Sequence, residues 1–149
     1  MCPEPASYHK ATAVERFFNR AFGVLVGLGL GLPHNYLVQV RGRKTGKIFS
    51  TPIDLLELNG KRFLVAPRGR TQWVRNAEAA GEVMLKKGRR RQRYRIRAIP
   101  DSDKPEILKT YVDRFKTTVQ RYFPVPAGSA PQAFVEIARN YPVFELLAA

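Results

Sequence analysis

The chain has 149 residues and a formal net charge of +14, from 26 lysine and arginine residues against 12 aspartate and glutamate residues. This length fits one domain with its own core, whereas the single Cys2 and the two histidines, His9 and His34, argue against a disulfide framework and a cysteine- or histidine-rich metal site. The charge favours a polyanionic partner: nucleic acid, anionic lipid or an acidic small molecule.

The N-terminal part of the chain begins with a polar segment. Residues 1–10 are expected to form a flexible tail, without the pattern of a secretory signal. Apolar residues at helical spacing predict a helix within residues 11–32. Its apolar run is shorter than the roughly 20 residues of a spanning helix, so it packs into the fold or docks on a membrane surface. We expect a cytoplasmic protein, with peripheral contact at the inner face of the cell membrane left open.

From Asn35 onward the chain alternates apolar and polar side chains, as half-buried strands do. Asn59-Gly60 is a strong hairpin signal, and Gly81 is placed to cap a helix. Asp103 and Glu106 predict a reciprocal cap at the start of a later helix. The predicted strands are 36–41, 48–58, 61–66, 83–87, 92–99 and 142–147, the predicted helices are 71–80, one from 103 and 132–139, and the loop is 123–131.

Six strands with helices at the ends and on one flank predict a small antiparallel β-barrel of the α+β class. Residues 35–149 would form the barrel and its C-terminal helices, within a single domain that spans residues 1–149. Pro52 marks an edge strand or a bulge.

Hydrolytic chemistry has little support in the sequence. His9 lies in a polar segment and His34 follows a proline, so both are expected in turns or at the surface. Asp54 and Glu57 stand at odd separation in one predicted strand and would point to opposite faces. No catalytic residue is identified.

The segment from Arg41 to Lys47 (RGRKTGK) is the first candidate binding site. Its two glycines allow a sharp turn and a close approach to a ligand, while Arg43, Lys44 and Thr45 supply donors. Turn amides next to cations form a phosphate site, although a basic hairpin tip is also common on ordinary surfaces.

The second candidate segment is Ala66 to Asn76 (APRGRTQWVRN), which places cations and a glycine before a predicted helix. The amides of a helix N-terminus favour an anion. Trp73 could stack on a flat ring, but it shares the apolar face of the helix with Ala77 and Ala80. A role in the core and a role in a ligand site are both open for it.

Together, the two segments resemble the deazaflavin-dependent nitroreductase and quinone reductase family, whose members use coenzyme F420 on a split β-barrel. The order and spacing of the short motifs carry the resemblance, which covers about residues 36–99 and a terminal Pro-Val-Phe. In this chain the motifs are Gly42-Arg43-Lys44-Thr45-Gly46 with Pro52, Asn59-Gly60, Ala66-Pro67-Arg68-Gly69, Trp73-Val74-Arg75-Asn76 and Pro142-Val143-Phe144.

The resemblance implies an FMN-binding-like split β-barrel that holds F420. The turn would hold the phosphate of the cofactor tail, Arg68 and Gly69 would lie near the deazaflavin, and Trp73 and Asn76 would frame the ring. The polyanionic tail suits the charge of the chain. The cofactor-binding residues it implies are Arg43, Lys44, Thr45, Gly46, Pro52, Ala66, Pro67, Arg68, Gly69, Trp73 and Asn76.

This chain departs from the family at Phe49, where many relatives carry an arginine. One contact to the cofactor tail is therefore in question, although Lys47 or Arg41 could replace it. The implied reaction is hydride transfer to an electron-poor acceptor such as a quinone, an enone or a nitro-compound. The proton donor, the physiological acceptor and the oligomeric state cannot be read from the sequence.

Two alternatives remain open. The first is an FMN-binding split barrel, because the phosphate of FMN would also suit the Arg43–Lys44 turn. The second is binding of nucleic acid or an anionic membrane by the predicted hairpin 86–97, which carries eight cations in twelve residues (KKGRRRQRYRIR). Its Arg93, Arg95 and Arg97 are expected on the outer face and Tyr94 on the inner face, where it could not stack on bases.

Overall fold

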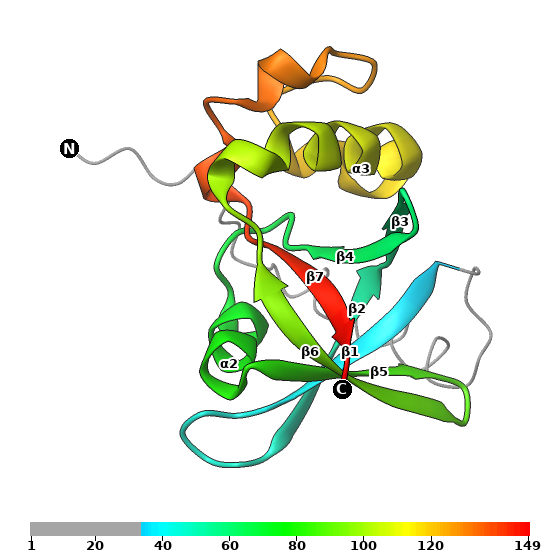
Figure 1. Ribbon diagram of the computed structural model, residues 1–149, viewed down its shortest axis with the longest axis vertical. Helices are drawn as coiled ribbons and strands as arrows, with labels where there is room; N and C mark the ends of the chain where they lie inside the picture. The colour runs from blue at the N-terminus through cyan, green and yellow to red at the C-terminus, as the bar shows by residue number, and fades with distance from the viewer. Residues whose placement is uncertain (1–33) are drawn as a thin grey trace.

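Figure 1 shows the computed structural model, in which residues 34–149 are described. The predicted N-terminal tail and helix lie outside these residues. The described elements are β1 (Asn35–Arg41), β2 (Ile48–Asp54), β3 (Leu56–Leu58), β4 (Lys61–Val65), α2 (Gln72–Ala80), β5 (Glu82–Lys87), β6 (Arg90–Ala98), α3 (Lys104–Val119) and β7 (Val143–Ala148), with 3-10 turns at Asp101–Asp103, Gln120–Tyr122, Pro131–Phe134 and Ala138–Asn140.

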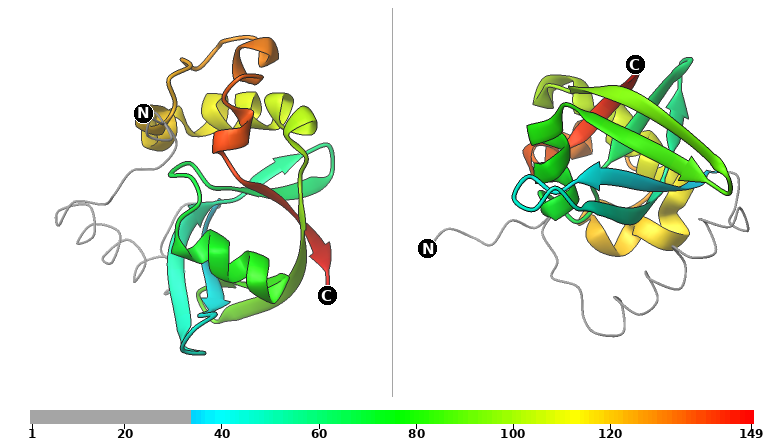
Figure 2. Two further views of the ribbon diagram at one scale, coloured as in Figure 1. Left: turned by 90° about the vertical axis from the view of Figure 1, so that its left-hand side faces the viewer. Right: turned by 90° about the horizontal axis from the view of Figure 1, so that it is seen from below.

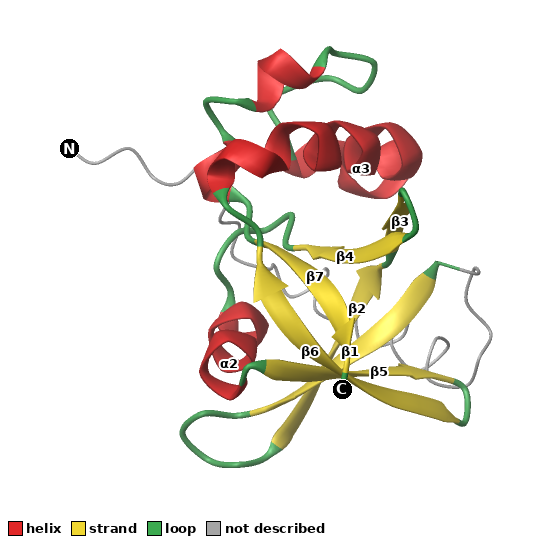
Figure 3. Cartoon of the chain, in the orientation of Figure 1, coloured by secondary structure: helices red, strands yellow, loops and turns green. Residues whose placement is uncertain are grey.

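Seven strands form one antiparallel sheet in the order β2-β1-β5-β6-β7-β4-β3. The sheet curls on itself, α2 lies against β1 and β5, and α3 covers one end (Figures 1 and 2). Figure 3 shows that the 3-10 turns gather with α3 at that same end. An antiparallel barrel with flanking helices is therefore confirmed.

Strand alternation divides the apolar side chains between two cores. Val38 and Val40 of β1 point into the curled sheet and pack with Leu64 and Phe144, while Gln39 between them is only half-buried. The second core lies beneath α3, where Leu56 and Phe63 of the short β3–β4 hairpin meet the buried face of that helix; its helical members include Ile107, Leu108, Tyr111, Val112 and Phe115. The two cores fix the curl of the sheet.

The predicted turn at Asn59-Gly60 and the predicted helix cap at Gly81 are confirmed. Asn59 and Gly60 both have positive φ, 53° and 76°, which is the backbone of the tight hairpin turn that such a pair favours. Gly81 ends α2 in the left-handed region at φ 74°, and its N–H donates to the carbonyl oxygen of Ala77 at 2.7 Å. The first turn joins the paired strands β3 and β4, and the Gly81 cap leads the chain from α2 into β5.

The predicted strand 48–58 is divided in two, so the sheet has seven strands and not six. β2 pairs with β1 at one edge of the sheet, and β3 pairs with β4 at the other edge. The change occurs at buried Leu55, whose N–H donates to the carbonyl oxygen of His34 at 2.8 Å. Pro52 lies in edge strand β2, as expected, because proline has no N–H to donate to a second neighbour.

Two predicted helical details are wrong. Asp103 has helical φ and ψ and makes no side-chain capping bond. Instead, buried Lys104 pairs with Asp101 at 2.7 Å and donates to the carbonyl oxygen of Ala138 at 3.2 Å, which fixes the start of α3. The predicted helix 132–139 consists of two 3-10 turns, because so short a segment gains little from continuous helix and is held by buried Phe134 and Ala138.

Candidate functional site

The turn between β1 and β2 is closed by its own backbone. The N–H of Gly42 donates to the carbonyl oxygen of Lys47 at 2.6 Å, and the N–H of Gly46 donates to that of Gly42 at 2.9 Å. Gly46 has φ 76°, which favours glycine. A Cβ at Gly42 would lie 2.7 Å from Cε2 of Phe49, so a side chain at this position would displace the aromatic ring.

Asn76 of α2 joins this turn to the second predicted segment. Its Oδ1 accepts the backbone N–H of Arg43 at 3.1 Å and the guanidinium of Arg43 at 2.7 Å. Gln72, one turn earlier on α2, accepts from the same guanidinium at 2.9 Å. Because Asn76 is only 4% exposed, it is a fixed anchor for the turn. The two candidate segments, 41–47 and 66–76, are thus in direct contact.

The other polar groups of the turn face outward. Arg41 donates to the carbonyl oxygen of Gly46 at 2.9 Å and therefore supports the turn. The Oγ1 of Thr45 accepts the N–H of Lys47 at 3.3 Å. Lys44 is exposed and has no hydrogen-bond or ion-pair partner among residues 34–149. The Lys44 ammonium could therefore bind a phosphate without breaking a hydrogen bond or an ion pair to residues 34–149.

An open pocket of about 500 Å³ lies beside the turn, on the outer face of α2. Three guanidinium groups, of Arg43, Arg70 and Arg75, line it together with Glu78 and Ala79. Glu78 accepts from Arg70 at 2.7 Å and 2.9 Å, so one carboxylate stands against three cations. The pocket can therefore receive further negative charge.

Arg70, Gln72 and Arg75 lie in the second candidate segment but were not assigned as binding residues, and Glu78 lies outside that segment. Helical spacing was the available signal, because residues three and four apart on α2 share a face. Gln72, Arg75, Asn76 and Ala79 follow this spacing. The missing information was that this face of α2 stands beside the β1–β2 turn.

The loop after β4 is folded onto the core. The N–H of Ala66 donates to the carbonyl oxygen of Pro142 at 2.9 Å, and the N–H of Gly69 donates to that of Ala66 at 3.1 Å. Gly69 is buried with φ 83°, while Pro67 and Arg68 are half-buried. Contact of Arg68 and Gly69 with the deazaflavin remains a prediction, as does cofactor binding by Ala66, Pro67 and half-buried Pro52 on β2.

Trp73 lies in the core. It is 8% exposed, and its ring meets that of Phe144 edge-on at a centroid distance of 6.2 Å. Its burial among apolar side chains favours a role in the core over a role in a ligand site, the two roles that the sequence left open. Contact between the cofactor ring and Trp73 remains a prediction.

The surface around Phe49 is apolar, whereas the rest of the turn is cationic. Phe49 is 48% exposed and its neighbour Ile48 is 50% exposed, so two apolar side chains border the cations. Arg41 is occupied with the turn carbonyl, which leaves exposed Lys47 as the candidate that could replace a missing arginine.

Three tyrosines near α3, Tyr111, Tyr122 and Tyr141, are buried. Burial raises the pKa of Tyr111 well above its ordinary value and that of Tyr141 to about 12. The Tyr141 hydroxyl donates to the carbonyl oxygen of Tyr122. These tyrosines therefore belong to the core beneath α3. Separately, residues 34–149 contain no group of three potential metal ligands.

A second polar cluster surrounds Asp54 at the other end of the β1–β2 hairpin. Asn35 donates to Oδ1 of Asp54 at 2.7 Å, Thr118 donates to Oδ2 at 3.3 Å, and Nε2 of His34 lies 3.4 Å from Oδ1. The His34 ring also packs on Phe115 at 4.7 Å. Burial raises the pKa of Asp54 above its ordinary value, and His34, Thr118 and Asn35 oppose this shift.

We expect Asp54→Asn to change how stability depends on pH. The folded protein binds the Asp54 proton more tightly than the unfolded chain does, so wild-type stability falls as pH rises from about 4 through the raised pKa. Asparagine has no such proton, so the variant gains stability relative to wild type between about pH 4 and pH 7. Urea unfolding across this range measures the difference.

Asp113→Asn is the matched control with the opposite sign. Bonds from Lys109 and from the N–H of Gly128 lower the pKa of Asp113, so its stabilisation is present above the unfolded pKa and lost as pH falls. This variant should lose stability relative to wild type toward neutral pH. Parallel pH profiles for wild type and Asp54→Asn would contradict the account of Asp54.

The curled antiparallel sheet with flanking helices is that of the split-barrel proteins, and solved structures agree. An F420-H2 dependent reductase (FDR-A) is 21% identical, with TM-score 0.50, 76% of this chain covered and 94% of that chain. General Stress Protein 26 from Bacillus anthracis is 13% identical, with TM-score 0.51 and coverage of 80% and 81%. Protein Atu2129 from Agrobacterium tumefaciens, of unknown function, is 14% identical, with TM-score 0.57 and 85% of this chain covered.

The chain spans only 53% of the Agrobacterium tumefaciens protein. A comparison with curated proteins gave no match. The model of the F420H(2)-dependent quinone reductase family matches residues 12–124. The chain therefore belongs to the F420H(2)-dependent quinone reductase family, and the resemblance seen in its motifs is confirmed. Family membership supports an F420-dependent reductase.

Proposed function

We propose that this protein reduces an electron-poor acceptor, a quinone, an enone or a nitro-compound, with reduced F420. The observation that carries the proposal is the cationic β1–β2 turn, held against α2 by the contact from Arg43 to Asn76. A turn with exposed donors on a rigid anchor suits a cofactor phosphate. The match of the family model supports the same cofactor.

The residues around the turn fit the anionic part of F420. Lys44 and Thr45 stand outward and can meet the phosphate, while Arg43 is held by α2. The adjoining pocket adds Arg70 and Arg75, whose charge suits the carboxylates of the cofactor tail. The turn thus offers cations that suit the phosphate, and the pocket offers cations that suit the carboxylates of the tail.

When bound in its reduced form, F420 supplies the hydride. The protein's part is to hold the cofactor and acceptor in line and to exclude water. The site accordingly calls for few titrating groups. The buried Tyr111, Tyr122 and Tyr141 are not assigned as proton donors.

We expect Lys44→Ala to weaken F420 binding by about 1.5–3 kcal/mol, the size of a hydrogen bond to a charged group. This corresponds to an increase in Kd of roughly 10- to 150-fold. Lys61→Ala, which removes an exposed lysine at the start of β4, is the matched control and should leave Kd unchanged. Equal Kd values for Lys44→Ala and wild type would remove the turn from the cofactor site.

Anaerobic oxidation of reduced F420 in the presence of menadione tests the activity. We expect turnover that depends on the enzyme and is impaired at low cofactor concentration in Lys44→Ala. Parallel assays with an enone and a nitro-compound rank the acceptor classes. Cofactor binding without oxidation by any of the three would contradict the proposed acceptors and leave the binding site intact.

A further inference from the structure

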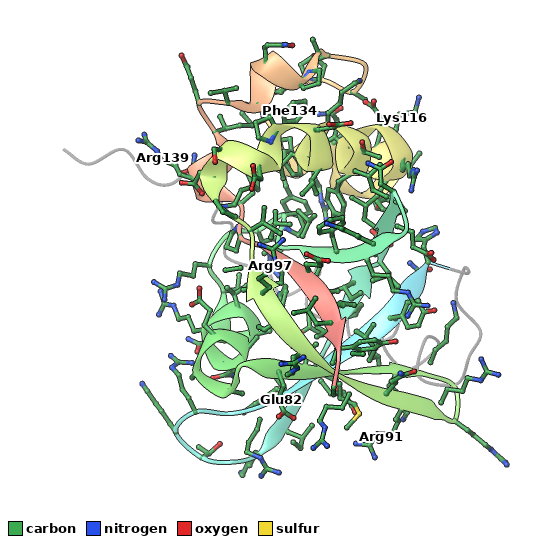
Figure 4. The ribbon with its side chains drawn as sticks, in the orientation of Figure 1. Glu82, Arg91, Arg97, Lys116, Phe134 and Arg139 are labelled. Atoms are coloured by element: carbon green, nitrogen blue, oxygen red, sulfur yellow. The ribbon has the colours of Figure 1, made fainter. Side chains whose placement is uncertain are left out.

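The β5–β6 hairpin carries a dense row of cations that the proposed reaction does not use. We call this set the cationic ribbon: Lys86, Arg89, Arg90, Arg91, Arg93, Arg95 and Arg97. Lys86 lies opposite Arg91 in the antiparallel pairing, so cations stand on both strands. Figure 4 labels Arg91 and Arg97 along this hairpin, with Glu82 between them in the view.

Strand alternation directs every strand residue of the ribbon except Arg90 to the outer face of the sheet; Arg90 shares the strand face of Tyr94 but lies beside the hairpin tip and is exposed. Tyr94 is 9% exposed and lies in the inner core, whereas Arg93 and Arg95 on either side of it are exposed. Successive outward residues on a strand are about 7 Å apart, so the guanidinium groups form a regular row. The inward position predicted for Tyr94 and the outward position predicted for its neighbours are confirmed.

Acidic side chains neutralise only one end of this row. Glu145 of β7 holds Arg97 at 2.7 Å, and Glu82 lies 3.7 Å from Arg93. At the hairpin tip, Arg89 and Arg91 are exposed and have no acidic partner among residues 34–149. Positive charge is therefore concentrated toward the tip.

We propose that the tip of the cationic ribbon docks on the phosphate headgroups of an anionic membrane. A flat row of guanidinium groups matches a planar array of phosphates, and each cation near such a surface adds attraction. The proposal does not require the reductase activity. If the acceptor is a lipid-soluble quinone, the same contact would bring the enzyme to the layer that holds its substrate.

The structure favours a membrane over single-stranded nucleic acid. Sequence-tolerant binding of single strands needs aromatic rings on which bases stack. Tyr94 is the one aromatic residue within the β5–β6 hairpin, and it faces inward, where its hydroxyl accepts from Arg62 at 2.7 Å. Half-buried Tyr36 of β1 lies beside the hairpin, with its ring covered by the ammonium of Lys87 at 4.9 Å. The ribbon offers charge alone, which suits headgroups.

The ribbon also lies away from the proposed cofactor turn. Leu37 near the start of β1 pairs with Lys86, whereas the Gly42–Lys47 turn follows the other end of β1. Figures 1 and 2 show the two hairpin tips at opposite sides of the sheet. Changes at the tip can therefore be tested separately from cofactor binding.

Co-sedimentation with lipid vesicles tests the proposal on the full chain. Wild type should bind vesicles of equal parts phosphatidylcholine and phosphatidylglycerol, lose binding as salt is raised, and ignore pure phosphatidylcholine. Arg89→Gln with Arg91→Gln should weaken partitioning roughly 30-fold. F420 binding, measured in parallel, should be unchanged in this variant.

Lys116→Gln with Arg139→Gln is the matched control, because it removes the same charge at the α3 end of the molecule (Figure 4). It should partition nearly as wild type does. Three results would overturn the proposal: no binding to the anionic vesicles, equal loss in the two double variants, or tighter binding to duplex DNA than to vesicles. The last would make the ribbon a nucleic-acid surface.

Discussion

Trp73→Ala is expected to lower the free energy of unfolding by about 3–5 kcal/mol, the usual cost of removing a large buried aromatic side chain. Trp73 is 8% exposed and packs with Phe144 between α2 and the curled sheet. Its loss leaves a cavity where α2 joins the barrel. Because Trp73 is the chain's one tryptophan, urea unfolding should be followed by circular dichroism.

Trp73→Phe separates packing from a ligand role. A smaller ring retains most of the apolar contact, so we expect a loss of about 1–2 kcal/mol and near-normal F420 binding. A stable Trp73→Ala protein that no longer binds F420 would contradict the structural role and place the indole in the cofactor site.

Asn76→Ala is expected to cost about 2–4 kcal/mol of stability, because it removes a charge-assisted bond and leaves the N–H of Arg43 without its acceptor. The same change frees the turn from α2, so F420 binding should weaken as well. Urea unfolding and cofactor titration of one protein preparation measure the two effects.

Gln72→Ala is the control for this variant. It removes the second acceptor of the Arg43 guanidinium but keeps Asn76 and the backbone bond. Because Gln72 is exposed, water can replace it, and the loss should stay below about 1 kcal/mol. An Asn76→Ala protein that is as stable and binds F420 as tightly as Gln72→Ala would show that Asn76 does not hold the turn.

Local signals predicted most of the fold. The alternation around Val38 and Val40 identified β1, and Asn59-Gly60 and Gly81 fixed the turns, because each constraint acts within a few residues. The break at Leu55 was missed since it depends on which strand pairs at each sheet edge. The start of α3 was predicted to within one residue, but its cap was predicted wrongly because Lys104, not Asp103, makes the contacts there.

The candidate site was predicted from the order and spacing of short motifs, which identify residues but not their contacts. The motifs pointed to Arg43 and Asn76 but gave no sign that the two side chains bind each other across 33 positions. Arg70 and Arg75 joined the site only when α2 was placed beside the turn. Contacts between distant segments set these positions, and a single sequence does not display them.

Fluorescence titration of the purified protein with F420, run beside FMN, tests the central claim most directly. We expect F420 to bind with a Kd in the micromolar range or tighter and FMN to bind far more weakly, because the turn and its adjoining pocket together suit a long polyanionic tail. FMN binding as tightly as F420, or no F420 binding by the folded wild-type protein, would contradict the account.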